Sequence, residues 1–150
     1  TFENIILTKN KKLYSSVFTG IQCLVFMKEN YNQDVSFEKF FSSIKYLDIE
    51  YSKTLWIHLT PLLRQPFFAT EKAQRYIALS INKCIDIYEN LADQGERYYL
   101  DGLYNCVEAL HQYYKSVKTT GTGETDELKQ CVEKARKIKN YEIANIWSYE

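Results

Sequence analysis

Apolar residues recur every three or four positions along most of the chain, which is the spacing of one helix face. The clearest case runs from Thr70 to Leu91, where the Thr70 hydroxyl can accept a first-turn N–H and the helix dipole favours Glu71. One stripe of this segment carries six apolar side chains: Ala73, Ile77, Ile81, Cys84, Tyr88 and Leu91. The pattern predicts a long amphipathic helix.

The same period predicts further helices over residues 8–30, 36–47, 48–62 and 96–118, and a C-terminal helix over 125–150 that kinks near Asn140. Pro61 and Pro66 lack backbone donors, so we expect them to break the chain and leave a connector at 64–69. A glycine at position 95 favours a short turn between antiparallel helices. The segment 119–125, with two glycines, predicts a flexible linker.

Strand signals are poor, because no stretch alternates apolar and polar residues cleanly. At 150 residues the chain has the length of one domain, and we expect residues 1–150 to form it. The predicted fold class is all-α, either a five- to six-helix bundle or a short array of helical hairpins that resembles a solenoid.

Charge and targeting signals limit the classes of partner and the locations that the sequence predicts. Lys plus Arg equals Asp plus Glu at 19 each, which disfavours nucleic acid because no overall positive field attracts it. No apolar run approaches the ~20 residues of a membrane span, and the first residues lack a secretory leader. The chain begins without Met and ends inside a helical pattern, so we expect a fragment or subunit of a larger cytoplasmic or nuclear assembly.

The four cysteines, Cys23, Cys84, Cys106 and Cys131, occupy apolar-stripe positions of predicted helices. Their wide spacing lacks the paired motifs of zinc sites and the close spacing of small disulfide frameworks. The pattern predicts reduced thiols that pack in the core.

Few residues suggest catalysis. His58 and His111 fall on different predicted helices, and Glu108 with His111 forms one Glu-x-x-His pair without the second copy that di-iron bundles use. The sequence therefore predicts no metal, no cofactor and no small-molecule site, and a chain without enzymatic activity. A small helical enzyme that uses a Cys/His or Glu/His pair remains the alternative.

Aromatic and basic residues suggest a protein partner. Adjacent helical residues point about 100° apart, so one member of each pair Tyr98–Tyr99 and Tyr113–Tyr114 is free to lie outside the core. We predict partner contacts at Tyr98 and Tyr113, and at the basic residues Lys134, Arg136 and Lys137 of the last helix. A second basic cluster lies at 9–12, and an ordinary solvated face is the other explanation for both clusters.

Two short stretches, Leu63-Arg-Gln-Pro66 and Ala73-Gln-Arg-Tyr-Ile-Ala-Leu-Ser80, resemble the central-helix region of poxviral Bcl-2-like proteins. The resemblance implies a viral-type helical regulator that binds helices of host proteins. An Asn-Trp-Gly-Arg-like element is absent from the sequence.

The preferred hypothesis is a non-catalytic, helical protein–protein interaction module. It would receive a partner segment in a groove between helices or on an aromatic face. The Bcl-2-like regulator and the small enzyme are the alternatives, and the sequence leaves homo-oligomerisation open.

Overall fold

The computed structural model describes residues 19–20, 22–23, 26–27, 37–43, 49–95, 98–120 and 122–149. In these ranges the regular elements are all helices, which confirms the predicted all-α class. The α-helices are α3 (Glu38–Ser43), α4 (Ile49–Leu63), α5 (Glu71–Asp93), α6 (Tyr98–Thr120), α7 (Asp126–Arg136) and α8 (Tyr141–Ile146). Two short 3₁₀ helices, η3 (Pro66–Ala69) and η4 (Trp147–Tyr149), complete the described elements.

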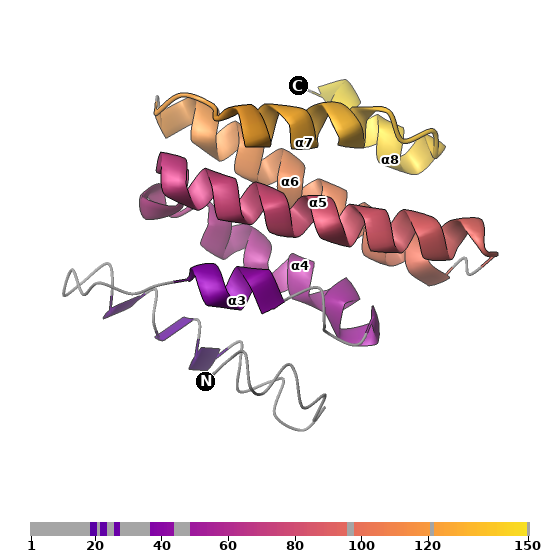
Figure 1. Cartoon of the computed structure of the whole chain (residues 1–150), viewed down its shortest axis with the longest axis horizontal. Helices are drawn as coiled ribbons and strands as arrows, with labels where there is room; N and C mark the ends of the chain where they lie inside the picture. Colours follow the sequence, from indigo (N-terminus) through magenta and orange to yellow (C-terminus); the bar gives the residue numbers. More distant parts are fainter. Residues whose placement is uncertain are drawn as a thin grey trace.

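The described helices pack as a bundle around α5 and α6, which lie side by side and antiparallel (Figure 1). Helix α4 packs on α6, α3 packs on α5, and α7 covers the opposite side of α5 (Figure 1). Helix α8 lies against α6. Of the described helices, none is both long enough and apolar enough to cross a bilayer.

Helix α5 follows the sequence prediction at both ends. Thr70 caps its start, because the hydroxyl oxygen accepts the Ala73 backbone N–H at 3.3 Å. Gly95 lies just past its end with a φ of +90°, which glycine adopts without strain, and its N–H donates to the Ala92 carbonyl at 3.0 Å. The predicted stripe is buried through Tyr88, and Leu91 is half-buried.

The predicted helix end near residue 62 is confirmed, but Pro61 itself does not break the helix, because α4 continues through this residue to Leu63. Proline at 61 removes only the hydrogen bond to the Ile57 carbonyl, four residues earlier. Pro61 and Ile57 are both exposed, so that carbonyl lies on the side of the helix where water replaces the missing donor. The chain leaves the α-helix only after Leu63, and the predicted connector contains η3.

The C-terminal prediction of one kinked helix over 125–150 is also corrected. Helix α7 ends at Arg136, and α8 begins only at Tyr141. The Asn140 side chain accepts the backbone N–H groups of Glu142 at 3.1 Å and Ile143 at 3.2 Å. Because Asn140 caps a new helix, the expected kink is a complete break.

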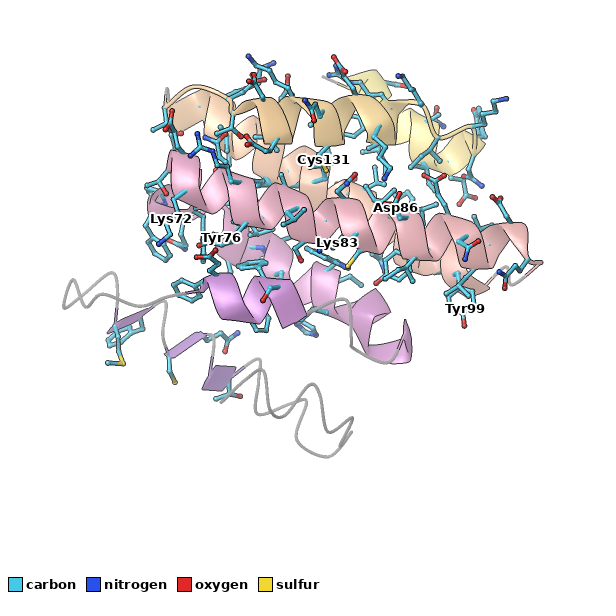
Figure 2. All side chains as sticks on the ribbon, viewed as in Figure 1. Lys72, Tyr76, Lys83, Asp86, Tyr99 and Cys131 are labelled. Carbon is cyan, nitrogen blue, oxygen red and sulfur yellow. The ribbon has the colours of Figure 1, made fainter. Side chains whose placement is uncertain are left out.

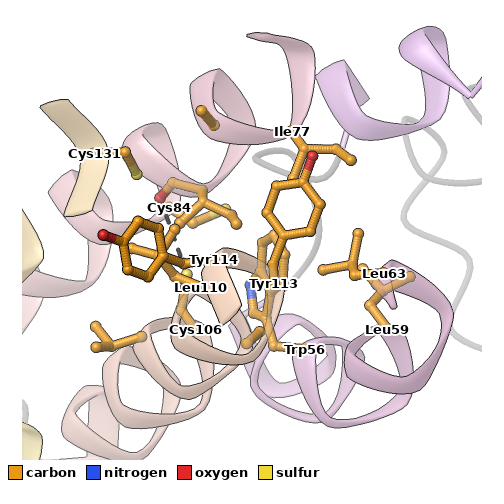
Figure 3. Packing of buried hydrophobic residues seen from close by; sticks show 14 of the residues in the cluster. Trp56, Leu59, Leu63, Ile77, Cys84, Cys106, Leu110, Tyr113, Tyr114 and Cys131 are labelled. Carbon is orange, nitrogen blue, oxygen red and sulfur yellow. Dashed lines mark hydrogen bonds between the residues drawn. The ribbon is translucent and has the colours of Figure 1, made fainter. Parts of the chain in front are cut away.

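The core is rich in large side chains. Trp56, Leu59 and Leu63 of α4 turn toward Tyr113 of α6 (Figure 3), and all four are almost fully buried. The Tyr113 hydroxyl donates to the Phe68 carbonyl at 2.6 Å, which fastens η3 to α6.

Much of the N-terminal prediction, including most of the helix at 8–30 and the basic cluster at 9–12, lies outside the described residues. Cys23 is described and is exposed, as is Phe26. The prediction that all four thiols are core residues is therefore wrong for Cys23, because this part of its stripe does not pack on the described core.

Candidate functional site

A groove runs between α5 and α7 on the exposed side of the bundle. It encloses about 330 Å³. Seven residues line it: Ala78, Leu79, Asn82, Glu127, Gln130, Cys131 and Lys134. Figure 2 shows Cys131 of α7 on the side of that helix that faces α5.

Small side chains account for the hollow. Ala78 and Cys131 are the inward-facing residues of the two helices at this point, and both are almost fully buried. Neither side chain is long enough to fill the space between the helices, so a depression remains at the surface above them. Leu79, the next residue of α5, is 54% exposed and forms an apolar wall.

Two ion pairs between α5 and α7 lie at the ends of the groove. Arg75 Nε lies 3.6 Å from Glu127 Oε1, and Lys134 Nζ contacts Asp86 Oδ1 further along both helices. Arg75 and Glu127 lie near the starts of their helices, and Asp86 and Lys134 lie closer to the ends. Since the pairs join corresponding parts of the two helices, α5 and α7 run parallel. The groove thus has charged ends, and its middle combines apolar residues with the side-chain amides of Asn82 and Gln130.

The start of α7 is fixed by Gln74, a fully buried polar residue of α5. Its side-chain nitrogen donates to the Ala69 carbonyl at 2.9 Å and to the Gly123 carbonyl at 2.8 Å. Its oxygen accepts the Thr125 N–H at 2.8 Å. One amide therefore anchors the end of the predicted linker to the core, and Thr125 then caps α7 by accepting the Leu128 N–H.

A smaller hollow of about 70 Å³ lies on the α3 side of α5, and Leu79 borders it as well. Tyr76 and Lys83 line this hollow (Figure 2). Burial, and secondarily the nearby Glu38 carboxylate, raises the pKa of Tyr76 to about 12. Leu79 is thus an exposed apolar ridge between two depressions.

The described thiols of the core are poor nucleophiles. Burial raises the pKa of Cys84 and of Cys131 to about 12, and it raises that of Cys106 well above the ordinary 9.0. A thiol with such a pKa holds its proton at neutral pH and is not the reactive thiolate. Burial here disfavours Cys/His chemistry at these three positions.

The two histidines differ in their exposure and in their surroundings. His58 is exposed on α4, whereas His111 is buried on α6 with its ring 5.2 Å from that of Trp147, edge to face. Across the described residues, no three His, Cys, Asp or Glu side chains gather closely enough to hold a metal ion.

The structure does not place the predicted partner-binding tyrosines on an exposed aromatic surface. Tyr113 is fully buried, so it is removed from the predicted aromatic surface, and Tyr114 is buried beside it. Both lie inside because α6 packs between α4 and α5, which covers two faces of the helix. The side chain of Tyr98 lies outside the described residues.

Two of the three predicted basic residues, Lys134 and Arg136, contact other side chains of the same chain. Lys134 pairs with Asp86 and lines the groove, and the Arg136 guanidinium lies 5.3 Å from the Trp147 ring centre. Lys137 is exposed at the C-cap of α7. Of the predicted residues, the structure brings only Lys134 to the groove.

Sequence reasoning missed Leu79, Asn82 and Gln130 as groove residues. The available signal was Leu79 itself, a large apolar residue that falls outside the buried stripe of α5. Comparison with protein-family models, with curated proteins and with solved structures found no match to this chain.

Proposed function

We propose that this chain is a non-catalytic protein–protein interaction module that binds a partner segment in the groove between α5 and α7. The observation that carries the proposal is the groove itself, an open apolar depression beside the exposed Leu79. Binding sites for peptide segments commonly combine an apolar seat with polar groups at the rim.

The lining residues describe the partner. An apolar side chain of the partner would pack on Leu79 and over Ala78 and Cys131, and its surface would be removed from water. The side-chain amides of Asn82 and Gln130 offer both donors and acceptors to a backbone or a polar side chain. We therefore propose an amphipathic partner segment with one apolar anchor.

The test compares two matched exposed residues. Leu79 is 54% exposed in the groove, and Ile57 is 55% exposed on α4. Tagged chains carrying Leu79→Glu or Ile57→Glu are used beside the unchanged chain to capture proteins from the source cell. We expect a stoichiometric protein that binds the unchanged chain and Ile57→Glu but is lost with Leu79→Glu.

Circular dichroism of both variants serves as the control for folding, since each changes an exposed side chain. Equal capture by Leu79→Glu and Ile57→Glu would reject the groove as the binding site. The absence of any stoichiometric protein with the unchanged chain would reject the function.

A further inference from the structure

A third depression, of about 430 Å³, lies between the first turns of α6 and α8, away from the α5–α7 groove. Six of its lining residues carry the argument: Leu100, Asp101 and Tyr104 of α6, and Tyr141, Glu142 and Ile143 of α8. Tyr141 is 78% exposed and Tyr104 is 38% exposed. Two tyrosine rings therefore border one depression.

The backbone around this hollow is held by buried contacts. Ile143 and Ile146 bury the inner face of α8, so Tyr141 and Glu142 lie on its outer side. The Asn140 oxygen accepts the N–H groups of Glu142 and Ile143. Because these N–H groups are already satisfied, the start of α8 does not attract an anion here.

The chemistry of the lining favours a cation. Asp101 and Glu142 contribute carboxylates, and none of the lining residues is Lys or Arg. Asp101 has another interaction within the chain, so Glu142 carries the electrostatic part of the argument. The faces of tyrosine rings attract cations as well.

The same chain already pairs cations with aromatic rings. Lys118 Nζ lies 4.6 Å from the ring centre of Tyr114, and the Arg136 guanidinium lies over Trp147. A planar guanidinium is suited to such a site, because it stacks on a ring while its N–H groups donate to a carboxylate.

From these observations we infer that the α6–α8 hollow binds an arginine side chain presented by an exposed segment of a partner protein. The guanidinium stacks on Tyr141 and donates to Glu142. This site does not depend on the α5–α7 groove or on the function proposed for it.

The probe is a pentapeptide, acetyl-Gly-Gly-Arg-Gly-Gly-amide, compared with the same peptide carrying citrulline, which has a similar shape and no charge. Binding to the whole chain is followed by NMR of the tyrosine ring signals. We expect saturable shifts of the Tyr104 and Tyr141 signals with the arginine peptide alone. Equal shifts with citrulline, or shifts spread over all tyrosines, would overturn the inference.

Variants separate the ring from the charge. Tyr141→Leu and Glu142→Gln should each weaken binding about two- to fivefold, the effect of losing one exposed cation contact. Tyr141→Phe keeps the ring and should bind as the unchanged chain does. Leu79→Glu should leave binding unaltered, which separates this site from the groove. Unchanged affinity in both Tyr141→Leu and Glu142→Gln would also reject the site.

Discussion

Two helix interfaces, α4–α6 and α5–α7, differ in the size of the side chains that lie between the helices. The first is filled by Trp56, Leu59 and Tyr113, which are buried completely or nearly so. The second places Ala78 against Cys131 and leaves a groove of about 330 Å³. Large residues thus close one interface, and small residues leave the other open.

Polar contacts differ in the same way. The Tyr113 hydroxyl bond to the Phe68 carbonyl, which joins α6 to η3 beside α4, is buried, whereas the ion pairs of Arg75 and Lys134 between α5 and α7 lie at the surface. Buried hydrogen bonds secure the start of α7, where Gln74 accepts the Thr125 N–H and Thr125 accepts the Leu128 N–H. Buried side chains thus close the α4–α6 interface, whereas the α5–α7 interface leaves an open groove at the surface.

Alkaline pH is expected to have the largest effect, because three thiols are buried among α5, α6 and α7. An unfolded chain loses the thiol protons near pH 9, whereas the folded chain keeps those of Cys84 and Cys131 up to about pH 12. Cys106 is shifted in the same direction. The folded state therefore binds more protons above pH 9, and stability falls as the pH rises.

Each buried thiol should lower the free energy of unfolding by roughly 1.4 kcal/mol per pH unit in that window, so the three together give roughly 4 kcal/mol. Urea denaturation under reducing conditions, at about pH 8 and about pH 10, measures the effect. Cys23→Ser, at an exposed position, is the control and should keep the profile. A free energy that is the same at both values would contradict burial of these thiols.

One substitution made at both interfaces tests the comparison directly. Leu59→Ala removes a buried side chain of α4 and should lower the free energy of unfolding by about 2–5 kcal/mol. Leu79→Ala removes the exposed wall of the groove and should cost less than about 0.5 kcal/mol. Urea denaturation gives both values. Similar costs would show that the groove wall is part of the core.

Periodicity and capping residues made much of the fold predictable. Helix α5 was predicted with its cap at Thr70 and its end near Gly95 because these signals are local. Pro61 was misjudged because its cost depends on whether water reaches the Ile57 carbonyl, which the sequence does not state. The break before α8 was only partly foreseen, since a cap and a kink share the same residue, Asn140.

The candidate site was less predictable, because it depends on which residues face each other. Ala78 and Cys131 lie far apart in the sequence, and only the packing of α7 on α5 makes them neighbours. We predicted that Tyr113 is exposed because an amphipathic helix taken alone has a solvent-facing side. In the structure, α4 covers the side of α6 that carries Tyr113. Residue spacing predicts one helix at a time and does not assign its neighbours.

The next prediction concerns the buried hydrogen bonds that secure α7. Gln74→Met keeps the size of the side chain and removes all three bonds, which leaves two carbonyls and the Thr125 N–H without this partner. We expect a loss of about 3 kcal/mol. Gln112→Met is the matched control, because that amide bonds Arg64 and Glu108 outside the buried core, and it should cost less than about 0.5 kcal/mol. Equal losses in urea denaturation would assign Gln74 no special role.

The smallest effect is expected for the ion pair at the far end of the groove. Lys134→Met removes the contact with Asp86 but keeps the apolar stem. Since Asp86 is exposed, solvent screens the pair, and the loss should be below about 1 kcal/mol and vanish in about 1 M salt. A loss near 3 kcal/mol that salt does not alter would reverse the comparison. Charge would then hold α7 in place, and the groove would be an element of stability rather than a surface left for a partner.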